Sequence, residues 1–189
     1  MPMQAQSLKP HGILDQLTGP GATPTELALQ FIPPAVGAVA AAIYGIQLGW
    51  DPLRWGLAAV FAVDLVGGVI TNATASAKRW FHRPGQGFWQ HFCFVGMHLL
   101  HLAVVAWLFR GGDWLYFAMT ASFLLGSAAV ILKVPLYVQR PVAMGLFGVA
   151  LLGSLYGPDP VVGLEWFLPL FYLKVLVSHL VKEEPLKVT

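Results

Sequence analysis

The chain has 189 residues, of which 57% are hydrophobic and only 11% charged, whereas about 25% of residues are charged in an average soluble domain. Its formal net charge of +2 is too small to favour nucleic acid as a partner, and its single cysteine, Cys93, excludes an intrachain disulfide. This composition predicts an all-α, polytopic integral membrane protein surrounded by the lipid bilayer.

Residues 1–30 are predicted to form a cytoplasmic N-terminal tail and the start of the first helix. They lack the charged start and the apolar run of about 7 to 15 residues that a cleavable secretory signal requires, so the first apolar stretch is expected to be retained. Thr23-Pro24-Thr25-Glu26 has the pattern of a capping box, with Thr23 as the N-cap and Pro24 in the first helical position. The first helix is therefore expected to begin near Thr23.

Windows of about 20 apolar residues predict a bundle of six transmembrane helices, because a helix of that length crosses the hydrocarbon core. In chain order they cover residues 31–50, 53–73, 88–109, 114–137, 141–156 and 161–181. The fifth window is short, and Pro141 is placed in its first helical position, where proline is tolerated. In a five-helix alternative this window is re-entrant and the last helix runs in the opposite direction. Residues 31–181 thus form a single helical membrane domain, followed by a cytoplasmic tail of residues 182–189.

The positive charges fall mainly on one side of the predicted bundle. With six helices, that side holds Lys9, Lys78, Arg79, Arg83, Lys133, Arg140, Lys182 and Lys187, and the other side holds Arg54 and Arg110. Short loops rich in Lys and Arg stay in the cytoplasm. The asymmetry predicts that both termini are cytoplasmic, in a membrane such as the bacterial inner membrane.

Several polar side chains lie inside the predicted helices: Asp64, Asn72, His91, His98, His101, Lys174 and His179. A charge in hydrocarbon costs roughly 2.5 to 3.5 kcal/mol on insertion scales, so ionisable residues there usually face a protein interior and mark a pathway or site. At a rise of about 1.5 Å per residue, Asp64, His98 and Lys174 fall at similar depth. Asn72, His91 and His179 form a shallower layer near the cytoplasmic edge.

The angular positions of these residues indicate which helices meet. At about 100° per residue, the three histidines of the helix at 88–109 share one face, and Asp64 lies on a stripe of small residues that allows close helix packing. We therefore expect Asp64 to lie near His98 or His101 and, from its depth, to be the partner of Lys174. Rotation along the last helix predicts that Lys174 points away from His179.

These residue types are compatible with a metal site or a haem site. Asp64, His98 and His101 are candidate ligands of a transition metal, because histidines at i and i+3 converge and a facing carboxylate supplies a third ligand. A site with three protein ligands leaves a position for water or substrate. His91 and His179, at similar depth on two helices, are candidate axial ligands of a b-type haem.

The same residues are compatible with two other functions. In a proton-coupled small-solute transporter or channel, Asp64, the histidines and Lys174 relay protons, because such groups titrate and exchange partners. In a structural subunit of a membrane complex or a homo-oligomer, Asp64 and Lys174 are a buried ion pair and the histidines hold helices together. In a metal- or haem-binding membrane enzyme or redox protein, Asp64 and Lys174 are the candidate catalytic groups. The sequence leaves these three functions open.

The loop that follows the second predicted helix carries Lys78, Arg79 and Arg83 around Trp80 and Phe81. Cations that flank aromatic residues beside a polar layer favour an anionic lipid head group as a partner. In the alternative interpretation, the cations fix the topology and the aromatic residues anchor the loop at the membrane interface.

Overall fold

The computed structural model describes residue 10, residues 12–157 and residues 160–183. All secondary structure in this part of the chain is helical, which confirms the all-α prediction. The elements are α1 (Ile13–Thr18), α2 (Pro24–Gln47), α3 (Pro52–Thr71), α4 (Ala75–Phe81), α5 (Phe88–Met97), α6 (Leu99–Val104), η1 (Val105–Phe109), α7 (Trp114–Lys133), α8 (Leu136–Tyr156), α9 (Phe167–Tyr172) and η2 (Leu173–His179). The two η elements are π-helical. Most of the predicted terminal tails, with Lys9 and Lys187, lies outside the described residues.

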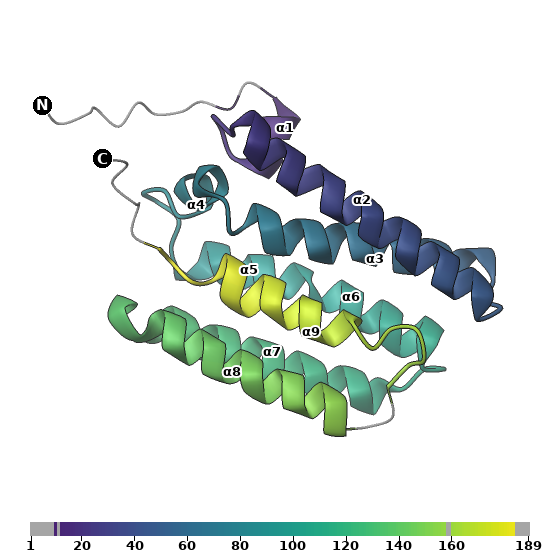
Figure 1. Ribbon diagram of the computed structural model, residues 1–189. Coiled ribbons are helices and arrows are strands. Elements are labelled where there is room, and N and C mark those ends of the chain that lie inside the picture. Colours follow the sequence, from purple (N-terminus) through teal and green to yellow (C-terminus); the bar gives the residue numbers. More distant parts are fainter. Residues whose placement is uncertain (1–9, 11, 158–159, 184–189) are drawn as a thin grey trace, which may run out of the picture.

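The helices form a bundle in which the C-terminal helix is central (Figure 1). Helix α2 packs along α3, and α7 packs beside α8 on the opposite side. The continuous pair of α9 and η2 lies between them and contacts both α3 and α8. Helices α5 and α6 follow one another along the chain and pack on α7.

Five helical stretches are long and apolar enough to cross a membrane: Pro24–Gln47, Pro52–Thr71, Phe88–Phe109, Trp114–Lys133 and Leu136–Tyr156. They indicate a membrane protein. The last predicted helix differs, because its helical part covers only Phe167–His179. That stretch is about 20 Å long at 1.5 Å per residue, whereas the hydrocarbon core is about 30 Å thick. Most of its residues are buried, so this short helix forms the centre of the bundle.

Several boundaries differ from the predicted ones, and proline and glycine explain three of the differences. The fourth helix ends at Lys133 rather than at residue 137, because Val134 is extended ahead of a proline. The next helix begins at Leu136, so Pro141 lies inside it rather than in its first position. The last helix begins at Phe167 rather than at residue 161, because the chain turns at Gly163, whose φ of 93° favours glycine.

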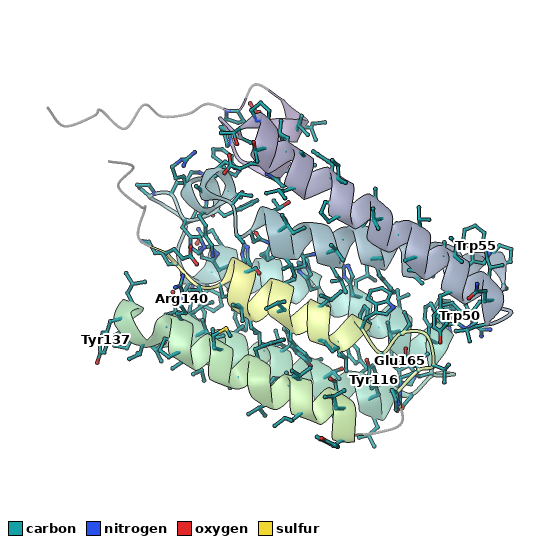
Figure 2. The ribbon with its side chains drawn as sticks, in the orientation of Figure 1. Trp50, Trp55, Tyr116, Tyr137, Arg140 and Glu165 are labelled. Atoms are coloured by element: carbon teal, nitrogen blue, oxygen red, sulfur yellow. The ribbon has the colours of Figure 1, made fainter. Side chains whose placement is uncertain are left out.

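One end of the bundle, which we call the α4 end, contains the start of α2, the helix α4 and the end of η2. There the Glu26 carboxylate accepts a hydrogen bond from Ser76 N, and Lys78 donates to Val181 O. The capping box at Thr23 is present, as predicted. Figure 2 shows Tyr137 and Arg140 at the α4 end and Trp50, Trp55, Tyr116 and Glu165 at the opposite end.

Candidate functional site

The deep cluster consists of Asp64, His98, His101 and Lys174. Asp64 is on α3, His98 lies at the junction of α5 and α6, His101 is on α6 and Lys174 is on η2. The Lys174 ammonium donates to Asp64 Oδ2 at 2.6 Å, and His101 Nε2 lies 3.0 Å from the same oxygen. The structure therefore brings Asp64 to both residues that the sequence suggested as its neighbours.

The members of the deep cluster are buried to different extents. The Lys174 side chain is only 4% exposed, whereas the Asp64 side chain is 39% exposed. A buried ammonium is costly without an opposite charge beside it, so Lys174 depends on Asp64. The Asp64 carboxylate, in contrast, keeps an accessible side.

Because Gly68 has no side chain, the Lys174 side chain can pass close to α3 and reach Asp64. A methyl group added at Gly68 would overlap Cγ, Cδ and Cε of Lys174. Small residues on membrane helices allow this kind of close approach. The glycine on α3 is thus part of the site although it carries no functional group.

The π-helical turn of η2 explains why Lys174 faces α3. In an α-helix, five residues would turn Lys174 and His179 about 140° apart. In a π-helix the hydrogen bonds run from residue i to i+5, which brings residues five apart closer together around the axis. Both side chains are buried and both contact α3, Lys174 through Asp64 and His179 through Asn72. The prediction that Lys174 points away from His179 is therefore wrong.

The hydrogen bond to Asp64 assigns the tautomer of His101. Because a carboxylate only accepts, Nε2 of His101 carries a proton, and in the neutral ring Nδ1 carries the lone pair. Nδ1 is buried, and within the described residues it has no hydrogen-bond partner. His98 stacks on His101 with ring centroids 5.3 Å apart, and its own Nδ1 donates to Phe94 O. The deep cluster thus contains a buried basic nitrogen that a carboxylate holds in place.

The shallow cluster consists of Asn72, His82, His91 and His179. His179 Nδ1 lies 3.2 Å from Asn72 Oδ1, and His179 Nε2 lies 3.2 Å from His91 Nδ1. An amide oxygen only accepts, so His179 donates to Asn72, and His91 donates to His179. His82 Nε2 donates to the His179 carbonyl at 2.9 Å, and the His82 ring stacks on His91. The three imidazoles are therefore joined through His179.

Lys78 closes the shallow cluster at the α4 end. Its ammonium donates to Ser178 O at 2.6 Å and to Val181 O at 2.5 Å, so it binds carbonyl groups left open at the end of a helix. Burial lowers the pKa of Lys78 to about 8, although Glu183 raises it. Burial, followed by the nearby His91 and Lys78, lowers the pKa of His82 to about 4. His82 is therefore neutral near pH 7.

Phe94 lies between the two clusters. Its ring centroid is 3.8 Å from that of His179 and 4.6 Å from that of His98. The clusters also meet at Gly68, whose carbonyl accepts a hydrogen bond from Asn72 and whose Cα faces the Lys174 side chain. One aromatic ring thus separates the shallow cluster from the deep cluster.

Across the described residues, no group of three or more His, Cys, Asp and Glu side chains is arranged to hold a metal ion. Asp64 and His101 meet, but Asp64 Oδ2 already accepts from Lys174, and His101 Nε2 already donates to it. His91 and His179 are hydrogen bonded to each other, whereas axial haem ligands bind iron from opposite sides. Both the metal and the haem assignment would require these side chains to rearrange, and both stay predictions.

The cations of the loop have different environments. Lys78 is buried and bound to carbonyl groups, so it is not available to a lipid head group. Arg83 stacks on Trp80, 3.7 Å from the ring centroid, and donates to the Trp80 carbonyl. Arg79 is exposed. The predicted anionic head-group site therefore depends on Arg79 and Arg83.

The sequence did not predict the roles of His82, Phe94 and Gly68 in the two clusters. His82 lies outside the apolar windows, so its depth gave no reason to join it to the other histidines. Its position four residues after Lys78, on the next turn, was the signal that could have placed it. Phe94 looks like any apolar residue of a membrane helix, and Gly68 was assigned only to helix packing.

No family model, no curated protein and no solved structure matches the chain. The functional assignment therefore rests on the geometry of the two clusters.

Proposed function

We propose that the protein is a proton-coupled membrane transporter or channel, in which the deep cluster binds a proton and the shallow cluster exchanges it with the α4 end. The observation that carries the proposal is His101 Nδ1, a buried lone pair without a partner in the described residues, on a ring that Asp64 orients. A histidine so placed accepts a proton without changing its partner at Nε2. Intramembrane groups of this kind are typical of proton relays.

The ion pair of Lys174 and Asp64 lies beside the ring that is proposed to carry the proton. A proton bound at His101 Nδ1 would place a positive charge next to the Asp64 carboxylate, to which Nε2 already donates. Lys174 uses the same carboxylate oxygen, so the added charge competes with a charge already present and the proton is not held permanently. This balance suits a group that must both bind and release.

The proposed route toward the α4 end passes from His101 to His98. Their rings stack and no hydrogen bond joins the two rings among the described residues, so the proposal requires a water molecule to carry the proton from one ring to the other. Phe94 separates His98 from His179, so its ring must move, or water must pass it, before a proton reaches the shallow cluster. From His179 the hydrogen bond to His91 leads onward. Phe94 is therefore the proposed gate of the route.

The proposed orientation places the α4 end in the cytoplasm of a bacterial cell. Lys78 and Arg79 lie on α4, and Arg83 follows it. Arg140 forms an ion pair with Glu183, just after η2. At the opposite end, Arg54 donates to Leu108 O. Membrane proteins retain loops rich in Lys and Arg on the cytoplasmic side, which supports this orientation.

Proton flux into liposomes tests the proposal. With a pH-sensitive dye inside and a potassium diffusion potential across the membrane, the wild-type protein is expected to carry protons. Asp64→Asn and His101→Gln are expected to reduce the flux to that of protein-free liposomes. Asp51→Asn is the matched control, because Asp51 caps α3 at the surface and asparagine caps helices equally well. Wild-type flux in both cluster variants would contradict the proposal.

A further inference from the structure

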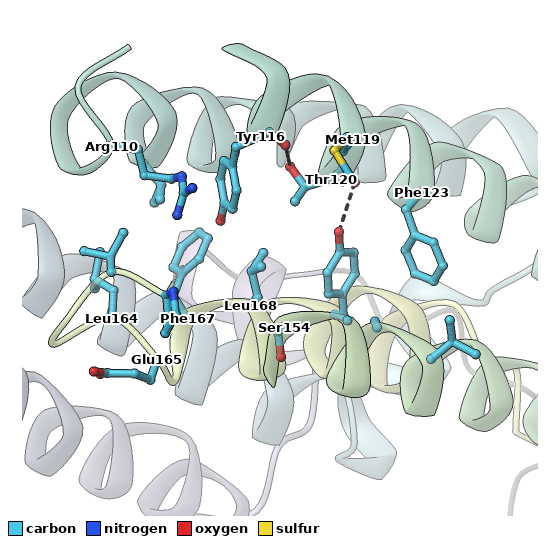
Figure 3. A pocket seen from close by; sticks show the side chains of 17 residues that line it. Arg110, Tyr116, Met119, Thr120, Phe123, Ser154, Leu164, Glu165, Phe167 and Leu168 are labelled. Carbon is cyan, nitrogen blue, oxygen red and sulfur yellow. Dashed lines mark hydrogen bonds between the residues drawn. The ribbon is translucent and has the colours of Figure 1, made fainter. Parts of the chain in front are cut away.

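A cavity of about 220 Å³ lies between α7, α8 and the segment that leads into α9, at the end opposite α4 (Figure 3). Its walls are mainly apolar and include Met119, Phe123, Val149, Leu164, Phe167 and Leu168. A dry apolar cavity of about 150 Å³ is large enough to bind benzene. This cavity therefore has room for a molecule of about nine non-hydrogen atoms on the same scale.

Most polar groups around the cavity are already satisfied within the protein. Thr120 Oγ1 donates to Tyr116 O at 2.7 Å, and Ser154 Oγ donates to Leu151 O at 2.8 Å. Tyr172 Oη donates to Thr120 O at 3.0 Å. These three hydroxyl groups therefore have no donor left for a ligand.

The Tyr116 hydroxyl is different. The residue is only 9% exposed, and its hydroxyl points into the cavity (Figure 3). Within the described residues, no hydrogen bond satisfies that hydroxyl, whose oxygen lines the cavity, whereas tyrosine hydroxyls in apolar surroundings usually find a partner. The cavity thus presents one unused hydrogen-bond donor in apolar surroundings.

The charges at the cavity are balanced by the protein itself. Arg110 lies over the Tyr116 ring and forms an ion pair with Asp113 at 2.9 Å. The Glu165 carboxylate accepts a hydrogen bond from Gly163 N. A charged ligand would leave its own charge without compensation in apolar walls, which is costly. The site therefore favours an uncharged ligand.

We propose that this cavity binds an uncharged, mainly hydrocarbon molecule that places one carbonyl or ether oxygen on the Tyr116 hydroxyl. The π-helical η1 contributes Val105 to the wall, and π-helical turns are frequent at functional sites. The proposal goes beyond proton transport and does not depend on it. Phe167 closes the cavity on the inner side, and its ring lies 5.2 Å from that of Phe61, which in turn contacts His101. A bound molecule would thus lie two aromatic rings from the deep cluster.

Binding of 2-octanone and of nonane, two probes of equal heavy-atom number, tests the hydrogen bond. Saturation-transfer NMR on the protein in lipid nanodiscs, corrected with empty nanodiscs, gives both affinities. We expect the ketone to bind about fivefold more tightly than the alkane, as one hydrogen bond would give. Tyr116→Phe is expected to remove this difference, and Tyr137→Phe, at a residue that is 84% exposed, to preserve it. Equal affinities in the wild type, or a difference that survives Tyr116→Phe, would overturn the proposal.

Filling the cavity tests the position of the site. Gly153 lines the cavity, and a side chain added there meets no atom within 4 Å, so Gly153→Leu is expected to abolish binding of both probes. Gly148→Leu is the control on the same helix, since Gly148 also has open space but does not line the cavity. If Gly153→Leu does not fold, Ala150→Phe serves the same purpose. Unchanged binding in a folded cavity-filling variant would overturn the proposal.

The source of the molecule is distinguished by competition. A phospholipid with a keto group in its acyl chain, incorporated in the nanodisc, is expected to displace 2-octanone if the cavity opens to the bilayer. If the ketone is not displaced, the molecule enters from water. Both results support the site and differ only in the path of entry.

Discussion

At the scale of single residues, Gly68 determines where Lys174 can lie. The Lys174 side chain passes over the Gly68 Cα, and an added methyl group would overlap three of its carbon atoms. Lys174 and Asp64 are therefore expected to separate when this position gains a side chain.

Gly68→Ala is expected to lower the stability of the protein as loss of the Lys174–Asp64 ion pair would. Breaking a buried pair costs about 3 to 5 kcal/mol when one partner keeps its charge, and the partial exposure of Asp64 reduces this figure. The midpoint of thermal unfolding in mild detergent should fall for Gly68→Ala as it does for Asp64→Ala. Gly56→Ala, on the same helix with open space around it, should not lower the midpoint, because alanine favours the helix more than glycine does. Equal midpoints for the two glycine variants would show that Lys174 adjusts without cost.

His82 predicts how stability depends on pH. The pKa of this histidine is about 4 in the folded chain and about 6.5 when unfolded. Between these values the unfolded state binds a proton that the folded state does not, so stability is lost as pH falls from about 6.5 toward 4. The slope is below about 1.4 kcal/mol per pH unit, because the ring is partly exposed.

Thermal unfolding at several pH values checks this expectation. His82→Gln retains a donor for the His179 carbonyl but no imidazole, so its stability should fall less steeply over that range. Arg79→Gln, at an exposed neighbouring position, should retain the wild-type slope. A wild-type slope in His82→Gln would mean that His82 is not the titrating group.

At the scale of elements, the short helix of α9 and η2 organises the bundle. It contacts α3, α7 and α8, and its π-helical turn aims Lys174 and His179 at the same neighbour, α3. Helix α4 fixes the end of η2, because Lys78 binds the carbonyl groups of Ser178 and Val181. The loop with the predicted head-group site therefore contains a structural contact, that of Lys78 with the end of η2.

Lys78→Met is expected to lower the free energy of unfolding by about 1 to 3 kcal/mol, the cost of leaving buried carbonyl groups without partners. Arg79→Met changes an exposed cation on the same helix and should have an effect within about 0.5 kcal/mol. Unfolding in a denaturing detergent series measures both. Equal stabilities of the two variants would contradict the proposed role of Lys78.

Part of this arrangement could be predicted from the sequence. Asp64, His98, His101 and Lys174 are identifiable because ionisable residues inside apolar windows are costly, and their depths follow from the helical rise. The direction of Lys174 could not be predicted, because a π-helical turn leaves no signature in the hydrophobic pattern. The tautomers could not be predicted either, since they depend on which atoms meet across helices.

At the scale of the whole molecule, apolar windows predicted the five helices that are long and apolar enough to cross a membrane, but not the role of the last helix. The apolar window of 21 residues, 161–181, contains a helix that covers only Phe167–His179. The first residues of the window form the turn at Gly163 instead of a helix. A short buried helix and a membrane-crossing helix are equally apolar. Hydropathy therefore does not distinguish the centre of the bundle from its outer helices.

Metal analysis of the purified protein separates the proton relay from the metal-dependent alternatives. The relay predicts that flux is the same before and after treatment with a chelator, and that the absorption spectrum has no Soret band. Stoichiometric metal that is lost in Asp64→Ala, or a Soret band lost in His91→Ala, would favour the metal or haem assignment instead.

The central claim is that His101 donates from Nε2 to Asp64 and keeps a lone pair without a partner at Nδ1. Nitrogen-15 NMR of the histidine side chains tests it directly, because it distinguishes a ring nitrogen that carries a proton from one that does not. We predict a ring signal, absent in His101→Gln, with a proton on Nε2 and none on Nδ1. A His101 signal with the opposite tautomer would contradict the account.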